Sequence, residues 1–271
     1  MANESKQISF EIIIPMGNIT IGKTKTRLSS ILSPVQRKNL TIWLLNHVVI
    51  NSYLALIDLE LKPNITILAS EYSKSEYDYL THLYAINNQL HIKWIGKSLN
   101  DSLQKHLSSS NGAKLILPGD LGLLTKFNVI DLVRASQSFN NPVIVKAYKD
   151  FGTNALLLPN EQVFKFKFGN NSFNIHKELL PKSVTLNQKG LNFDIDNSED
   201  LIELAEYNKK IETILAFTNK IILPKNKFTH VGNGGNSNCY CHILKLPKNY
   251  QLIESEYIYT NDIKSLELLI N

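Results

Sequence analysis

Three cationic side chains lie within one short segment, as Lys23, Lys25 and Arg27. The segment follows the first apolar run of the chain, Phe10–Ile14, which we predict to be a strand. Loops at the carboxyl ends of strands are where wound α/β sheets bind ligands. Cations in such a loop neutralise a triphosphate and the pyrophosphate that leaves it. The glycine spacing is not that of a Walker A loop, and a solvated basic loop is the plainer interpretation.

Two carboxylates stand at the ends of apolar runs. Asp120 follows the run Lys114–Leu117, and Asp196 follows Leu191–Ile195, which we predict to be another strand. Strand alternation would place Asp194 on the same side as Asp196, with Asp196 nearer the strand end. Acids in these places hold Mg²⁺ against phosphates, so Asp120 and Asp196 together predict a site for one or two Mg²⁺ ions. Either carboxylate alone is more often a helix cap or a loop acid.

A third pattern suits a small anion. Gly152 leads through Thr153 and Asn154 into an apolar run, and Gly169 leads through two asparagines to Ser172, where we predict a helix start. Backbone N–H groups at a helix start, with the hydroxyls of Thr153 and Ser172 nearby, would form a socket for a phosphate or carboxylate. An ordinary strand, turn and capped helix explains the same residues equally well.

The elements that must position these groups alternate between strand and helix, which predicts an α/β fold with a wound, largely parallel sheet. Ser33, Pro34 and Gln36 carry the signature of a capped helix start. Further strands are predicted at Ile65–Ala69, His91–Ile95, Pro142–Tyr148 and Ala155–Leu158, and helices at Leu99–Leu107, at Asn128–Ala135 and from Asn197 to about Phe217.

Composition limits the functional classes. The chain has 271 residues and a formal net charge of +5, with its lysines scattered rather than clustered, so we expect no nucleic-acid partner. Its two cysteines suit a reducing cytoplasm, and the polar start and short apolar runs predict neither a signal peptide nor a membrane partner.

The character of the sequence changes near Asn219. A glycine- and asparagine-rich stretch, 232–238, lies between two predicted strands, Ile221–Leu223 and Tyr240–Leu246. We therefore divide the chain into a main domain at residues 1–218 and a C-terminal appendage of unknown role at residues 219–271. An appendage of this kind makes a homodimer plausible.

The order of the motifs is more specific than any one of them. The chain resembles the phospholactate/phosphoenolpyruvate guanylyltransferase family of coenzyme F420 biosynthesis from about Ile12 to Leu204. The resemblance rests on Lys25-Thr26-Arg27-Leu28-Ser29 with Leu32-Ser33-Pro34, on Leu99-Asn100, on Leu117-Pro118-Gly119-Asp120-Leu121 with Leu123-Leu124-Thr125, on Gly152–Leu156 with Phe166–Gly169, Ser172-Phe173 and His176, and on Asp194-Ile195-Asp196 with Glu199-Asp200-Leu201.

This resemblance implies a nucleotidyltransferase fold, a glycosyltransferase-A-like three-layer sandwich with a mostly parallel mixed sheet. It implies transfer of GMP from GTP to a phosphorylated three-carbon acid, with release of pyrophosphate. The acid is 2-phospho-L-lactate by preference, or else phosphoenolpyruvate or 3-phosphoglycerate. Another acceptor, such as a molybdopterin or a sugar phosphate, and a non-catalytic binding protein of the same fold are the alternatives.

The resemblance also implies roles for single residues. It assigns the triphosphate and catalysis to Lys25 and Arg27, with Lys23 and Asn100 also on the nucleotide. It assigns Mg²⁺ and catalysis to Asp120 and Asp196. The acid would be held at Thr153, Asn154, Gly169 and Ser172.

The chain departs from the family pattern in three places. Met16 follows Pro15 where the family usually has a lysine soon after, and Ser98 replaces a glycine. Gly119 and Gly122 stand where the family tends to have alanine and proline, which predicts a looser loop around Asp120.

Overall fold

A seven-stranded mixed sheet forms the centre of the molecule. The computed structural model describes residues 9–17, 19, 22–69, 90–94, 98–109, 111–160, 164–207, 222–224 and 253–255. The strand order is β3-β2-β1-β4-β6-β5-β7, and β6 runs antiparallel to both of its neighbours while the other pairs are parallel. The strands are β1 (Phe10–Met16), β2 (Ile65–Ala69), β3 (Leu90–Trp94), β4 (Ala113–Ile116), β5 (Val143–Lys146), β6 (Thr153–Leu158) and β7 (Val184–Leu186).

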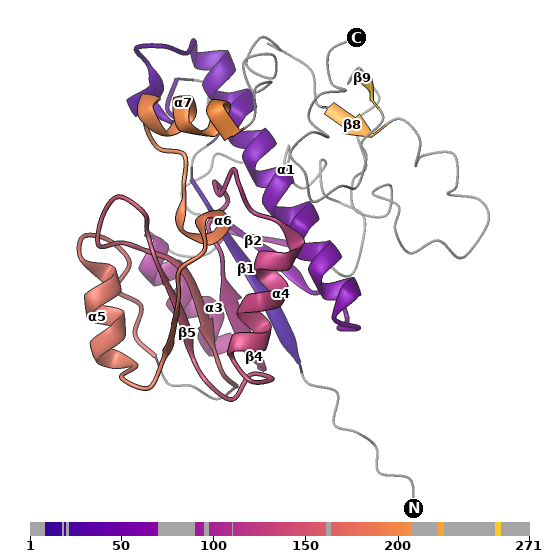
Figure 1. Cartoon of the computed structure of the whole chain (residues 1–271), viewed down its shortest axis with the longest axis vertical. Coiled ribbons are helices and arrows are strands. Elements are labelled where there is room, and N and C mark those ends of the chain that lie inside the picture. Colours follow the sequence, from indigo (N-terminus) through magenta and orange to yellow (C-terminus); the bar gives the residue numbers. More distant parts are fainter. Residues whose placement is uncertain are drawn as a thin grey trace, which may run out of the picture.

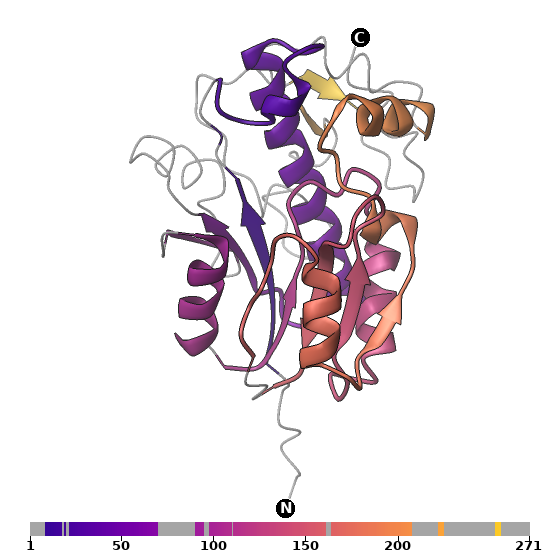
Figure 2. The ribbon, with the colours of Figure 1, turned by 90° about the vertical axis from the view of Figure 1, so that its left-hand side faces the viewer.

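Helices cover both faces of this sheet, which makes the predicted three-layer sandwich (Figures 1 and 2). One face is covered by α1 (Pro34–Asp58) and α4 (Lys126–Ala135), and the other by α3 (Leu99–Ser109) and α5 (Ser172–Leu179). Alternate residues of β1 show the division: Ile12 and Ile14 pack under α1, whereas Ile13 faces α3. Because both faces are buried, the central strand is a continuous apolar run rather than an alternating one.

The start of α1 follows the predicted capping pattern. Gln36 N donates to Ser33 Oγ at 3.3 Å, and Ser33 N donates to Gln36 Oε1 at 2.9 Å, with Pro34 at the first helical position. By length and composition alone α1 is the one helix among the described residues that could cross a membrane, and 61% of its most apolar stretch is buried. A helix buried in a protein core meets the same criteria of length and composition.

A third apolar cluster lies beyond the carboxyl ends of the strands and includes two leucines of α7 (Ser198–Tyr207), a helix that Figure 1 labels. The cluster joins the loop after β1, the first half of α1, the loop after β4, the segment before α7 and α7 itself. Its buried members are Leu28, Leu32, Leu40, Leu44, Leu123, Phe193, Ile195, Leu201 and Leu204. This cluster, named the upper cluster below, holds together the loops that carry the predicted site residues.

The loop around Asp120 is closely packed rather than loose, which corrects the expectation drawn from its glycines. A Cβ atom on Gly122 would lie 2.9 Å from Leu204 Cδ2 and 3.2 Å from Ile195 Cγ1. A Cβ atom on Gly119 would lie 3.3 Å from Leu45 Cδ1. Here glycine permits a close approach of the backbone to the upper cluster and the core.

The predicted strand Leu191–Ile195 is wrong. Its first part is the short helix α6 (Lys189–Asn192), and the rest is irregular backbone in which Ile195 N donates to Asp120 O at 3.2 Å. The alternation of apolar residues reflects burial without a place in a strand: Leu191 packs in the core against the sheet, and Phe193 and Ile195 lie in the upper cluster. The short edge strand β7 was not predicted.

The structure describes only a few of the residues for which C-terminal elements were predicted. A pair of parallel strands, β8 (Ile222–Pro224) and β9 (Ile253–Ser255), forms a separate small sheet, and β8 overlaps the predicted strand Ile221–Leu223. The predicted strand Tyr240–Leu246 and residues 208–217 of the predicted helix lie outside the described residues. The boundary at residue 218 stays a prediction.

A buried polar group fixes α3 against the sheet. Glu11 of β1 accepts hydrogen bonds from Thr66 Oγ1 of β2 at 2.5 Å and from His106 Nε2 of α3 at 2.8 Å. Burial is the largest influence on its pKa and raises it, but these hydrogen bonds and the charges of His106 and Lys114 together bring the pKa below the ordinary 4.5. The ionised carboxylate is thus favoured in the folded protein.

Replacing Glu11 therefore tests a pH-dependent part of the stability. Because the folded-state pKa is lowered, this stabilisation is present above about pH 4.5 and is lost as the pH falls through the folded pKa. We expect Glu11→Gln to lower the free energy of unfolding by about 2–3 kcal/mol at neutral pH, and the deficit to shrink in acid. Urea unfolding across the pH range measures it, with the exposed Glu178→Gln as the control. A deficit that stayed constant down to acid pH would contradict the assignment.

Candidate active site

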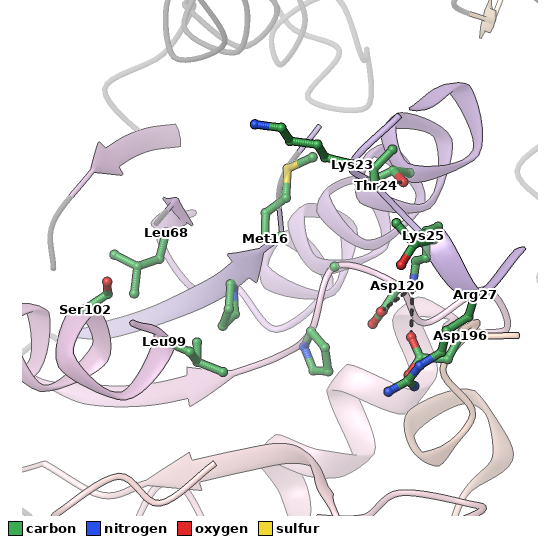
Figure 3. Close-up of a pocket in the computed structure, with 16 residues that line it drawn as sticks. Met16, Lys23, Thr24, Lys25, Arg27, Leu68, Leu99, Ser102, Asp120 and Asp196 are labelled. Carbon is green, nitrogen blue, oxygen red and sulfur yellow. Dashed lines mark hydrogen bonds and ion pairs between the residues drawn. The ribbon is translucent and has the colours of Figure 1, made fainter. Parts of the chain in front are cut away.

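A cavity of about 490 Å³ lies at the carboxyl ends of β1, β2 and β4 (Figure 3). Its walls come from the end of β1 and the loop that follows, from Thr41 of α1, Leu68 of β2, the first turns of α3, the loop after β4, and Asp196. Volumes of about 300–1,000 Å³ are typical of ligand pockets. The position agrees with the one predicted for a wound sheet.

Lys25 lies between the two predicted acids. Its Nζ atom is 2.7 Å from Asp120 Oδ2 and 3.2 Å from Asp196 Oδ1, and it also donates to the carbonyl oxygen of Ile195. Burial is the largest influence on the Lys25 pKa and lowers it, but the charges of Asp120 and Asp196 outweigh it and the pKa is raised. The ammonium group is therefore charged at neutral pH, and it joins three loops at one point (Figure 3).

The backbone of Lys25 is in the left-handed region, with φ 44° and ψ 49°. For a residue with a Cβ atom this conformation costs about 1–2 kcal/mol. The short 3-10 helix η1 (Thr26–Leu28) begins directly after it, and Leu28 lies in the upper cluster. Packing of η1 therefore offsets the strain and aims the Lys25 side chain inward.

The other two predicted cations also belong to the cavity. Arg27 Nη1 donates to Asp196 Oδ2 at 3.0 Å, although 73% of the Arg27 side chain is exposed. Lys23 is exposed and lines the cavity, and Figure 3 shows its side chain on the side of Met16, away from Asp120. The segment thus places one enclosed cation, Lys25, and two accessible cations, Lys23 and Arg27, at the cavity.

A third acid lies beside the pair. Burial, followed by the charge of Asp120, raises the pKa of Asp194 to about 6, although a hydrogen bond from Asn154 Nδ2 at 3.0 Å opposes the shift. The predicted placement of Asp194 on the side of Asp196 assumed a strand that is not formed. The group of three acids is nonetheless close enough for their charges to interact.

Asp200 fixes the backbone that presents Asp196. Its Oδ2 atom accepts hydrogen bonds from the backbone N of Asp196 and of Asn197, both at 2.9 Å, and its other oxygen pairs with Lys149. In return Asp200 N donates to Asn197 Oδ1 at 3.1 Å, which confirms the predicted helix start at Asn197. Lys149, from the loop after β5, was not singled out from the sequence.

The oxygen atoms around Lys25 are of the kind that Mg²⁺ takes. Among the described residues no three His, Cys, Asp or Glu side chains are grouped so that they could hold a metal ion by themselves. Mg²⁺ is usually bound by one or two carboxylates together with substrate phosphates, which is what Asp120 and Asp196 can offer. The Lys25 ammonium already stands among two carboxylates and a carbonyl as a cation, so the donor set fits a bound cation.

The residues predicted to form a socket for the acid make hydrogen bonds with one another. Thr153 N donates to Ser172 Oγ at 2.9 Å, and both side chains are buried. His176 Nε2 accepts from Lys167 N at 3.1 Å, so the neutral ring carries its proton on Nδ1, which lies 3.0 Å from Thr153 Oγ1. Burial lowers the pKa of His176 to about 4, which keeps the ring neutral.

These hydroxyls therefore join β6 to α5. Two N–H groups at the start of α5 also have backbone partners, Ser172 with Gly169 O and Phe173 with Phe151 O. Among the described residues that line the cavity, none is Thr153, Asn154, Gly169 or Ser172. Gly169 has φ +134°, a conformation that favours glycine. A role for these four residues in binding the acid stays a prediction.

Asn100 acts as a clamp between α3 and the segment before α5. Its Nδ2 donates to Phe168 O at 2.9 Å, and Phe168 N donates to its Oδ1 at 2.8 Å. Asn100 was predicted to bind the nucleotide, but it is absent from the described cavity wall and its amide is engaged here. Leu68 and Ser102 also line the cavity. Neither was predicted, because a leucine in a strand and a serine in a helix carry no functional signal.

Comparisons with known proteins identify the family of the chain. The profile of the family described as guanylyl transferase CofC like matches residues 10–214. A Methanococcoides burtonii protein named 2-phospho-L-lactate guanylyltransferase is 32% identical, over 73% of this chain and 84% of its own. A Rubrobacter xylanophilus protein named phosphoenolpyruvate guanylyltransferase is 30% identical, over 66% of this chain and 86% of its own.

The fold is also found among solved structures. A Desulfovibrio desulfuricans protein described as a nucleotide-diphospho-sugar transferase superposes with a TM-score of 0.52 at 14% identity, over 74% of this chain and 87% of its own. At that identity the likeness concerns the fold alone, which is the nucleotidyltransferase fold expected from the sequence. The profile match spans most of the chain and includes the Lys25, Asp120 and Asp196 loops. The chain belongs to the guanylyl transferase CofC-like family.

Proposed function

We propose that this protein transfers GMP from GTP to a small phosphorylated acid, with 2-phospho-L-lactate as the preferred acceptor and phosphoenolpyruvate as the second candidate. The product of the first reaction would be an intermediate of coenzyme F420 biosynthesis. The observation that carries the proposal is the Lys25–Asp120–Asp196 group at the cavity of a chain in this family. The choice of acceptor follows the names of the relatives.

The reaction needs alignment and charge compensation more than it needs a base. A phosphate oxygen of the acid, already ionised at neutral pH, forms a bond to the α-phosphorus of GTP. The bond from that phosphorus to the bridging oxygen of the β-phosphate breaks, and pyrophosphate leaves with the electron pair. No proton has to be removed from the nucleophile, so a neutral, buried histidine such as His176 is not required to act.

The chain supplies cations where the charge is greatest. Arg27 stands beside the acids and can pair with triphosphate oxygens, and Lys23 reaches the cavity from the same loop. Lys25 lines the cavity between the two acids and adds its positive charge there. Asp120 and Asp196 would hold Mg²⁺, which when bound offsets the negative charge of the triphosphate and of the leaving pyrophosphate. Asp200 keeps Asp196 in place through the two backbone hydrogen bonds.

A turnover assay tests the proposal. With GTP and Mg²⁺, we expect pyrophosphate release when 2-phospho-L-lactate is added, and slower or no release with phosphoenolpyruvate and 3-phosphoglycerate. The product, in which a diphosphate bridge joins the acid to guanosine, should be found by mass spectrometry in equal amount to the pyrophosphate. Samples without acid, and with ATP in place of GTP, serve as controls. Absence of pyrophosphate with all three acids would contradict the proposed function.

Replacement of either acid, Asp120 or Asp196, should abolish most of the activity. Asp120→Asn and Asp196→Asn each remove one anionic ligand with little change in volume, so we expect kcat to fall by orders of magnitude while the fold persists. Because both act on one bound cation, the double variant should be little worse than the poorer single variant. Steady-state kinetics measure this, with Asp131→Asn, a surface acid of α4, as the control. Losses that multiply would mean that the acids act independently.

Lys25 should stabilise the protein before any ligand binds. Lys25→Met leaves Asp120 and Asp196 facing each other without their shared cation, so we expect a loss of about 2–4 kcal/mol in the free energy of unfolding. Added Mg²⁺ should raise the melting temperature of the variant more than that of the unaltered protein, because it can take the vacated position. The exposed Lys182→Met is the control. No response of the variant to Mg²⁺ would argue against a cation site at these oxygens.

A further inference from the structure

The cavity has two chemically different ends. At one end lie Lys25, Asp120 and Asp196. At the other lie Met16, Leu68 and Leu99, with the exposed Lys23 on the side of Met16 (Figure 3). Met16 and Leu68 are almost fully buried, whereas Leu99, the first residue of α3, is 37% exposed at the cavity mouth. A thioether and two hydrocarbon side chains offer nothing to a phosphate or a carboxylate, but they suit the faces of a flat heterocycle.

One hydroxyl group stands at this apolar end. Ser102, in the first turns of α3, is 1% exposed and lines the cavity beside Leu68 and Leu99 (Figure 3). Within the part of the chain that the structure describes, its Oγ atom has no hydrogen-bond partner. Other serines of the same helix do: Ser108 Oγ donates to Gln104 O at 2.9 Å and Ser109 Oγ donates to His106 O at 3.0 Å. An unpaired buried hydroxyl is destabilising, so its presence at this position calls for an explanation.

The surroundings keep this hydroxyl in place. Leu103, the next residue, is fully buried against the sheet with Ile13, which sets the rotation of α3. His106, one turn later, bonds to Glu11 of β1 at 2.8 Å. Ser102 N donates to Ser98 O at 2.9 Å, so the backbone at this position is regular helix. The Ser102 side chain is thus held at the cavity wall before any ligand arrives.

We propose that the Ser102 hydroxyl hydrogen-bonds the edge of the nucleotide base, with Met16, Leu68 and Leu99 against the faces of the base. This rests on the proposed function, in which GTP is the donor. The arrangement follows the chemistry of a nucleotide: its phosphates need the charged end, and its base needs an apolar slot with few polar groups. Guanine presents both donors and an acceptor along its edge, and a hydroxyl can serve as either partner.

Binding of nucleotide without any acid tests the inference. In the presence of Mg²⁺, Ser102→Ala should weaken the binding of GTP about tenfold, the effect of one hydrogen bond lost from a buried site, and leave the binding of inorganic tripolyphosphate unchanged. Isothermal titration calorimetry measures both. The melting temperature of the free variant should stay the same or rise, because an unpaired hydroxyl has been removed.

Ser52→Ala is the matched control. Ser52 lies in α1, is fully buried and also has an Oγ atom without a partner among the described residues, but it does not line the cavity. Its removal should affect the melting temperature in the same way and should leave GTP binding unchanged. Ser102→Cys, which keeps the volume and weakens the hydrogen bond, repeats the test if the alanine variant does not fold.

The outcomes separate this inference from the proposed function. Unchanged GTP affinity in Ser102→Ala, or an equal loss for GTP and tripolyphosphate, would overturn the assignment of Ser102 to the base. Failure of the unaltered protein to transfer GMP to any acid would overturn the proposed function, while the binding test still decides the role of Ser102. Failure of the unaltered protein to bind GTP would overturn both.

Discussion

The site depends on one ammonium group held between two carboxylates from distant parts of the chain. Lys25 comes from the loop after β1, Asp120 from the loop after β4 and Asp196 from the segment before α7. The apolar residues close to them in sequence, Leu28, Leu123 and Ile195, all belong to the upper cluster. Burial of these side chains brings the three loops together. The ion pairs of Lys25 with Asp120 and Asp196 then fix how the loops lie relative to one another. Packing and electrostatics therefore act on the same few turns of backbone.

Polar residues around this centre divide into two kinds. Those at the cavity, such as Lys23 and Arg27, are exposed or paired with groups that a ligand can compete for. Those behind it, such as Asn100 and Thr153, have hydrogen bonds that are already made within the fold. A buried group with its partners in place gains little from a ligand, because binding would have to break those bonds first. Availability, more than residue type, distinguishes a binding group from a structural one.

The sequence predicted the place of the site better than its detailed contacts. The strand ends before Lys25 and Asp120 were predictable because a strand with two buried faces is a continuous apolar run, and the start of α1 was predictable from Ser33 and Gln36. The supposed strand Leu191–Ile195 failed because alternating burial does not reveal what covers the apolar side. The partners of Asn100 and Thr153, namely Phe168 and His176, lie in other elements, so local spacing held no sign of them.

The antiparallel strand β6 separates two parts of the sheet, of which only one supplies residues to the cavity wall. Every described residue of the cavity wall comes from the β1, β2 and β4 half or from the loops and helices around it, with Asp196 added from the segment before α7. The half that contains β5, β6, β7 and α5 contributes none of its strand or helix residues to that wall. Residues of that half reach the cavity at one remove, as Asn154 of β6 does through its hydrogen bond to Asp194, whose charge interacts with those of Asp120 and Asp196. One half of the sheet therefore forms the wall, and the other acts on it from behind.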